Sequence, residues 1–393
     1  MLRKEPDQKK VSDLERIYLD HAATSPLHPE VISRMIAVME TQFGNPSSIH
    51  SFGRETRHIL DETRQVLADS IHAKPTNIIL TSGGTEADNL AVIGYAEKNQ
   101  HLGKHIITTQ IEHHAILHSC QELERQGYEV TYLPVDETGV ISVGEFQNAL
   151  RDDTILATIM YGNNEVGSIQ PIKEIGELLK EHQAILHTDA VQAYGVEKLD
   201  VNELQVDMLS VSAHKINGPK GIGFLYVADG ISLSPRAFGG EQERKRRAGT
   251  ENVPAVAGFQ VAVKIAMKEQ EAKQNLYREF KTLFIDCLKS EDVTFEANGL
   301  LDKSLPHVLN LSFPGTNVEA MLVNLDLAGV AVSSGSACTA GSIDPSHVLV
   351  AMFGKDSERI TNSIRFSFGL NNTKEQIETA AKETAKVVKR LVK

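Results

Sequence analysis

The chain is poor in cysteine, in basic residues and in long apolar runs. Its 393 residues include only Cys120, Cys287 and Cys338, too few and too scattered for a disulfide framework or a structural zinc site. Lysine and arginine number 40 against 52 acidic residues, and the net charge of −12 argues against general binding to nucleic acid. No stretch approaches the length of a membrane span, and no signal peptide opens the chain. We therefore expect a cytoplasmic protein that contacts neither membrane nor nucleic acid directly.

Short apolar runs alternate with helical patterns over the first two thirds of the chain. Strands are predicted over 77–81, 105–109, 128–133, 154–160, 184–188, 207–211 and 223–227. This alternation is typical of an α/β fold with a mostly parallel sheet and helices on both faces. A long helix over 254–290 leads to a second unit with strands predicted over 293–296, 307–312, 330–333 and 363–367. The chain ends on an amphipathic helix over 374–391, with an apolar stripe of Ile377, Ala381, Ala385 and Val388.

Lys215 is the most informative residue of the sequence. It ends a run of apolar and small residues, the place where α/β folds put their chemistry, and a poorly solvated amine there can form a Schiff base. Asp189 ends another apolar run, about one crossover and one strand upstream. Either residue alone is more often a surface lysine or a capping aspartate. Together they form the pair that pyridoxal phosphate (PLP) requires, a lysine for the aldehyde and a carboxylate for the pyridinium nitrogen.

Two segments that follow predicted strands add candidate contacts. Gly84 and Thr85 stand in a glycine-rich turn that opens a helix, which suits a cofactor phosphate, although such turns are also plain helix caps. His113 follows the strand over 105–109 and could stack on a cofactor ring and move protons. The alternative is a metal site, because His114 and His118 are four residues apart on a helix. No third ligand is evident, so we expect no metal.

Three later segments supply further polar candidates, each with an ordinary alternative. Asn164 is either a turn former or a cofactor and substrate contact that acts with Gln192, Ser212 and His214. The charged loop over 239–252 is either a solvated loop or a segment that crosses a dimer interface and presents Thr250 to a phosphate. Arg365, inside a late strand, needs a carboxylate partner, which is either structural or the carboxylate of an amino acid substrate.

Cys338 differs from the other two cysteines in its surroundings. Small residues flank it on both sides, from Ser333 to Ser342, so nothing nearby can bury its thiol. A free cysteine is more often a buried small hydrophobic residue, which we expect for Cys120 and Cys287 on helical patterns. Cys338 is therefore the candidate reactive thiol.

Ten motifs occur in an order that points to one family. They are YLDHAATSP, GNPSSIH, TSGGTEADN, IEHHA, YGNNEVG, HTDAVQ, SVSAHKINGPKG, RRAGTEN, SSGSACTAGS and SIRFSFG. From about Ile17 to the C-terminal helix the chain resembles the cysteine desulfurases of the NifS/IscS type, in the class V aminotransferase group of fold-type I PLP enzymes. The SSGSAC segment resembles that of the family's first group, whose cysteine loop is long.

The resemblance implies roles for the candidate residues. It implies that Lys215 binds PLP covalently, that Asp189 meets the pyridine nitrogen and that Gln192 meets the ring hydroxyl. His113 would stack on the ring and move protons. The phosphate would be held by Gly84, Thr85, Ser212 and His214, with Thr250 from the other subunit. The substrate carboxylate would be bound by Asn164 and Arg365, and Cys338 would accept the sulfur.

The resemblance also implies a fold and a reaction. The expected molecule is a fold-type I homodimer with a seven-stranded sheet in a large domain over 29–271. A smaller α+β domain, 272–393, would carry the Cys338 loop and be joined by residues 1–28. The expected reaction converts L-cysteine to L-alanine and passes the sulfur, as a persulfide, to an iron–sulfur scaffold or a tRNA 2-thiouridine synthase. Rival expectations are a selenocysteine lyase, a PLP aminotransferase, or a binding protein of this fold that has lost its cofactor.

Overall fold

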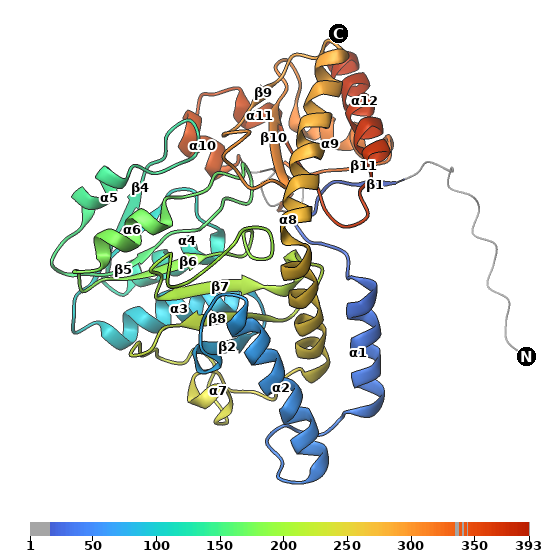
Figure 1. The fold of residues 1–393 in the computed structure, drawn as a ribbon. Coiled ribbons are helices and arrows are strands. Elements are labelled where there is room, and N and C mark those ends of the chain that lie inside the picture. Colours follow the sequence, from blue (N-terminus) through green and yellow to red (C-terminus); the bar gives the residue numbers. More distant parts are fainter. Residues whose placement is uncertain (1–15, 335–337, 340–341, 344, 393) are drawn as a thin grey trace, which may run out of the picture.

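The computed structural model describes residues 16–334, 338–339, 342–343 and 345–392, and its centre is a seven-stranded sheet (Figure 1). The strands follow the order β2-β8-β7-β6-β5-β3-β4. Strand β8 runs antiparallel to both of its neighbours, and every other pair within the sheet is parallel. The predicted mostly parallel seven-stranded sheet is therefore confirmed. The strands are β2 (Ile78–Thr81), β3 (His105–Thr109), β4 (Glu129–Leu133), β5 (Thr154–Thr158), β6 (Ile185–Asp189), β7 (Met208–Ser212) and β8 (Gly223–Val227).

Helices cover both faces of this sheet, and strands β2, β3, β5, β7 and β8 are therefore buried along their whole length. One face packs in a core with residues of α1 (Pro29–Thr41), α2 (Ser51–Asp69), α6 (Ile172–Leu179) and the first half of α8 (Val253–Ser290). The other face packs mainly on α3 (Gly84–Asn99) and α4 (His114–Arg125). Helix α5 (Val143–Ala149) lies in the connection from β4 to β5, and the short α7 (Gln242–Lys245) precedes α8.

A second apolar core forms at the other end of α8. It contains residues of the second half of α8 and of β10 (Val308–Ser312), β14 (Ser363–Ser367), α9 (Val318–Leu327) and α12 (Lys374–Leu391). Strand β9 (Glu296–Ala297) extends the sheet of β10 and β14. Strand β1 (Ile17–Tyr18) pairs with β11 (Val330–Ala331), so the start of the chain joins this core. Figure 1 shows α8 running beside both parts of the molecule. On this basis we propose the domain boundaries given above, 29–271 and 272–393 with 1–28.

Several expectations about the second unit need correction. The strand expected over 293–296 begins only at Glu296, because Val293 still closes the end of α8 through a hydrogen bond to the Leu288 carbonyl. Helix α9 was missed because its sequence is apolar on most sides and shows no clear period; the Asn317 side chain caps its first turn. The helices α10 (His347–Phe353) and α11 (Arg359–Asn362) were also missed. The predicted stripe of α12 is confirmed, since all four of its residues are buried.

The charged extension, expected to be loose, lies at residues 1–15, outside the described part of the chain. Among the helices that are described, none is long and apolar enough to cross a membrane.

Candidate active site

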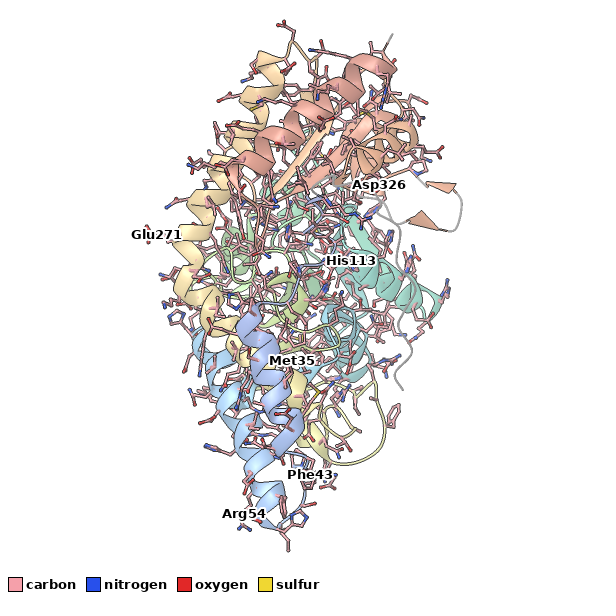
Figure 2. The ribbon with its side chains drawn as sticks, turned by 90° about the vertical axis from the view of Figure 1, so that its right-hand side faces the viewer. Met35, Phe43, Arg54, His113, Glu271 and Asp326 are labelled. Carbon is pink, nitrogen blue, oxygen red and sulfur yellow. The ribbon has the colours of Figure 1, made fainter. Side chains whose placement is uncertain are left out.

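A cavity of about 480 Å³ opens where the carboxyl ends of the sheet strands meet the second core. Its wall brings together most of the residues that the sequence singled out, although they come from segments far apart in the chain. These are Gly84, Thr85, His113, Asn164, Asp189, Gln192, Ser212, His214, Lys215 and Arg365. In Figure 2, His113 lies at mid-height of the molecule, between the large sheet and the upper core.

Lys215 ends a short 3₁₀ turn (Ala213–Lys215) that directly follows β7. Its Nζ donates hydrogen bonds to the carbonyl oxygens of Ala22 and Ala23, the latter at 2.8 Å. Burial, and then the nearby Arg365 guanidinium, lower the pKa of this amine to about 8. At pH 7 roughly a tenth of the molecules thus carry a neutral lysine, the form that attacks a carbonyl carbon.

Asp189 is the last residue of β6, and its carboxylate faces the same cavity as Lys215. Its Oδ1 accepts a hydrogen bond from the backbone N–H of Val191 at 2.9 Å. Burial raises the pKa of Asp189, and the nearby Lys215 charge opposes that change. A buried carboxylate of this kind is stabilised by a cationic N–H donor placed in the cavity. The protonated pyridine nitrogen of PLP is such a donor, so the pair fits this cofactor.

The phosphate end of the cofactor has a matching site at the N-terminus of α3. Gly83 has a φ of +150°, and a Cβ added at Gly84 would lie 2.8 Å from the Val191 side chain. The first turn of α3 therefore presents its free backbone N–H groups to the cavity without side chains in the way. Thr85 and Ser212 line the cavity beside it and can add hydroxyl donors. These groups fit an anion such as a phosphate.

His113 is the N-cap of α4, and its Nδ1 accepts the backbone N–H of Ala115 at 3.1 Å. One side of the His113 ring is open to the cavity. Burial of the rest of the ring, together with the nearby Lys215 charge, lowers the pKa of His113 to about 4. The ring is therefore neutral at pH 7 and carries its proton on Nε2, because Nδ1 is the acceptor. It offers a flat face for stacking and one N–H for proton exchange.

The carboxylate partner of Arg365 in the structure is a residue of the protein, Asp20, which was one of the two possibilities left open by the sequence. Its Nη2 lies 2.7 Å from Oδ1 of Asp20, and its Nη1 donates to the Asn164 carbonyl at 3.0 Å. Its Nε has no hydrogen-bond partner among the described residues, although the atom is buried. Nη1 and Nη2 each carry a second N–H, and Arg365 lines the cavity, so the guanidinium retains donors for a ligand.

Two predicted site residues do not join the others in the described structure. Thr250 is exposed in the loop before α8 and does not line the cavity. The backbone of Cys338 lies in β12 (Cys338–Thr339), which pairs with β13 (Ser342–Ile343), but its side chain lies outside the described residues. Cys120 is buried on α4, as expected, and burial raises its pKa. Cys287 is only half-buried on α8, so the expectation of full burial was wrong for this residue.

The rival reading of the histidines as a metal site receives no support from their positions. The ring of His114 lies 5.3 Å from that of His118 and 4.8 Å from that of His347, measured between centroids. Within the part of the chain that is described, no group of three or more potential ligands is placed to hold a metal ion.

Sequence reasoning missed several residues of the cavity and its wall. Asp20 was not identified as a site residue, although it lies in the YLDHAATSP motif. Glu112 is buried beside His113; it accepts hydrogen bonds from Thr109 and from the Met160 backbone, and burial raises its pKa to about 8. Asp88 lines the cavity from α3, and burial also raises its pKa. Their only signal in the sequence is a carboxylate close to the end of a strand or the start of a helix.

Comparison with known proteins agrees with this geometry. The family model of class-V aminotransferases matches residues 17–379. A putative cysteine desulfurase IscS 1 of Bacillus subtilis (strain 168) is 62% identical over 96% of this chain and all of its own length. The solved structure of a NifS-like protein has a TM-score of 0.89 at 33% identity, covering 96% of this chain and 100% of its own.

A second solved structure, SspA in complex with cysteine, has a TM-score of 0.78 at 35% identity. It covers 90% of this chain and 98% of its own. The site built around Lys215 and Asp189, together with these matches, shows that the chain belongs to the class-V aminotransferase family, as a cysteine desulfurase of the NifS/IscS type.

Proposed function

We propose that this protein takes the sulfur of L-cysteine onto Cys338 in a PLP-dependent reaction that releases L-alanine. The observation that carries the proposal is the pair of Lys215 and Asp189 on the wall of one cavity, with Arg365 beside them. The balance is simple: the Cβ–S bond of cysteine breaks, one sulfur–sulfur bond forms at Cys338, and one hydrogen is added to Cβ. No outside oxidant or reductant is required.

The proposed cofactor site uses the residues whose fit is described above. Lys215 would bind the cofactor aldehyde, Asp189 the pyridine nitrogen, and the turn at Gly84 the phosphate. Gln192 lies on the cavity wall beside Lys215 and is the candidate partner of the ring hydroxyl. When bound, PLP supplies an electron sink for the Cα of an amino acid.

The remaining residues would bind the substrate and move protons. Arg365 and Asn164 both line the cavity and would hold the cysteine carboxylate there. The neutral ring of His113 can exchange a proton with the substrate thiol or with Cys338. The Cys338 thiolate then attacks the substrate sulfur, and the electron pair of the broken bond stays on the Cβ side. This step depends on the fraction of thiolate at Cys338.

We propose that the sulfur then passes to an acceptor protein, an iron–sulfur scaffold or a tRNA 2-thiouridine synthase. The net charge of −12 favours delivery to a protein over direct contact with tRNA, because a nucleic acid surface needs a basic partner.

The homodimer is proposed from an apolar face at the end of α1 and the start of α2. Phe43, Ile49 and Phe52 are 76%, 91% and 50% exposed, and Phe43 stacks on Phe52 with ring centroids 5.3 Å apart. Figure 2 shows Phe43 at the lower end of the molecule, far from His113. Phe238, in the connection between β8 and α7, is 87% exposed as well. A second copy of the chain is the proposed cover of this face, and it would bring Thr250 to the partner's phosphate site.

The double substitution Phe43→Asp and Phe52→Asp should convert the dimer to monomers, because it places charges in an apolar interface. Light scattering after size-exclusion chromatography measures the mass, and Leu327→Asp, at an exposed apolar residue of α9, serves as the matched control. Affinity for PLP should fall together with the dimer. A wild-type monomer, or a doubly substituted protein that remains dimeric, would contradict the proposal.

Arg365→Lys should raise the KM for L-cysteine about tenfold to a hundredfold, because charge-assisted hydrogen bonds contribute about 1.5–3 kcal/mol and lysine lacks the planar fork. The control is Asp20→Asn, which removes the structural partner but keeps the guanidinium free for the substrate. Steady-state kinetics give KM and kcat separately. An unchanged KM in Arg365→Lys would mean that the arginine serves only to bind Asp20.

Cys338→Ala tests the proposed function itself. The variant should bind PLP and cysteine, because no residue of the cofactor site is altered, but alanine release should fall by at least about 10²-fold, the contribution expected of a covalent nucleophile. Mass spectrometry should find one added sulfur atom on Cys338 of the wild type and none on this variant.

The controls for Cys338→Ala are Cys120→Ala and Cys287→Ala, which should stay near wild-type activity whatever they do to stability. Turnover of cysteine by Cys338→Ala at close to the wild-type rate would favour an aminotransferase or a selenocysteine lyase. Mapping of the added sulfur to Cys120 or Cys287 would also contradict the mechanism.

A further inference from the structure

A carboxylate lies beside the turn that is the candidate phosphate site. Glu86 stands in the first turn of α3, directly after Gly84 and Thr85, but it does not line the cavity. Its Oε2 accepts a hydrogen bond from the backbone N–H of Ser82 at 2.7 Å. The positive end of the helix stabilises this negative charge, and the same end is needed for the phosphate of PLP. A bare carboxylate at this position would therefore repel the anion that the turn has to bind.

Arg247 neutralises this carboxylate through a forked contact. Its Nε donates to Oε1 of Glu86 at 2.7 Å, and its Nη2 donates to Oε2 at 3.2 Å. The two side chains are 25% and 24% exposed, so solvent only partly screens the pair. Burial alone would raise the pKa of Glu86, but the hydrogen bonds from Arg247 and Ser82 lower it below its ordinary value. Glu86 is therefore ionised at pH 7, and the Arg247 charge balances it.

The backbone that leads to Arg247 is held in an unfavourable conformation. The three successive residues Glu243, Arg244 and Lys245 have φ values of +47°, +57° and +67°. Side chains other than glycine seldom adopt this left-handed region, and such a run persists only where its surroundings fix it. We therefore looked for the contacts that hold this segment in place.

Glu243 anchors the segment to strand β2. Its side chain is buried and accepts two hydrogen bonds from Arg64, at 2.7 and 2.8 Å. Its Oε2 also accepts the backbone N–H of Leu80 at 3.0 Å. Strand β2 leads directly into the phosphate turn, so the loop and the turn are fixed to the same strand. Because Arg64 neutralises Glu243, Arg247 remains available for Glu86.

A second ion pair joins the same two segments at the other end of α3. Arg236, also in the connection between β8 and α7, donates from Nη1 to Oε1 of Glu97 at 2.7 Å. The two side chains are 38% and 32% exposed. Glu97 lies about 16 Å along the helix from Glu86, at a rise of about 1.5 Å per residue. The two pairs share residue types and the segments they join, but only the Arg247 pair adjoins the phosphate turn.

We propose that Arg247 is a positioning residue for the cofactor, which neutralises Glu86 so that the turn at Gly84 and Thr85 can bind the phosphate of PLP. Arg247 acts through Glu86 and does not line the cavity itself. The proposal rests on the proposed function, in which this turn holds the cofactor phosphate.

The proposal predicts opposite results for the two members of the pair. Arg247→Gln should weaken the binding of PLP about tenfold, because the Glu86 charge then opposes an anion at a partly buried helix terminus. Glu86→Gln should bind PLP at least as tightly as the wild type, since a glutamine still accepts from the Ser82 N–H and carries no charge. An ion pair that only stabilises the loop would weaken binding in both variants.

The measurement is equilibrium dialysis of the holoenzyme against a series of PLP concentrations, with bound cofactor read from its absorbance. The same titration with pyridoxal, which lacks the phosphate, should not distinguish Arg247→Gln from the wild type. A general loss of structure would change both affinities, so the comparison isolates the phosphate. This readout does not depend on catalytic activity.

Further variants separate charge from shape. Arg247→Lys keeps the charge but loses the fork, and it should retain most of the affinity for PLP. Glu86→Gln together with Arg247→Gln should return to the wild-type affinity, because neither charge remains. Arg236→Gln is the matched control and should bind PLP as the wild type does. If Arg247→Gln does not fold, Arg247→Lys and Glu86→Gln still decide the question.

Two results would overturn the proposal and leave a purely structural role. One is an equal loss of affinity for PLP and pyridoxal in Arg247→Gln, and the other is a loss of PLP affinity in Glu86→Gln or in Arg247→Lys that matches the loss in Arg247→Gln. A wild-type protein that binds no PLP would refute the proposed function instead. Titration with inorganic phosphate then still decides: weaker binding in Arg247→Gln than in the wild type supports the role of Arg247, and equal binding overturns it.

Discussion

The burial of the Lys215 amine at the edge of the sheet is the constraint on which the rest of the site depends. A desolvated ammonium is costly, so its pKa falls to about 8 and a reactive neutral fraction exists at physiological pH. Some of the surrounding groups stabilise the charged amine and one destabilises it. Two backbone carbonyls accept from the amine, Asp189 opposes the fall in pKa, and Arg365 promotes it. The same carboxylate and guanidinium are the candidate contacts for the cofactor and the substrate.

The N-terminal segment connects this site to the second core. Strand β1 pairs with β11, and Asp20 then binds Arg365 of β14. The next residues supply the carbonyls of Ala22 and Ala23 to Lys215, and Ser25 donates to the His214 carbonyl. One short stretch of chain thus holds the lysine of the large sheet and the arginine of the smaller unit in a common frame. A shift of one unit against the other would change the contacts of both residues.

The sequence predicted most of the sheet and most of the cavity wall, because both follow from local patterns. Apolar runs marked the strands, and polar residues at their carboxyl ends marked the site, as at Asp189 and Lys215. The pairing of Arg365 with Asp20 joins residues at opposite ends of the chain, and no local pattern encodes such a contact. Helix α9 was missed because apolar residues occur on its exposed side as well as on its buried side, which removes the amphipathic period from its sequence.

The fold prepares a lysine that is partly neutral at pH 7. The direct measurement is the pKa of Lys215 in the protein freed of cofactor, obtained from the pH dependence of its reaction with a simple aldehyde or from NMR of its labelled side chain. We expect a pKa near 8, with the charged form below that pH and the reactive amine above it. A value close to 10.4, that of an unperturbed lysine, would contradict it.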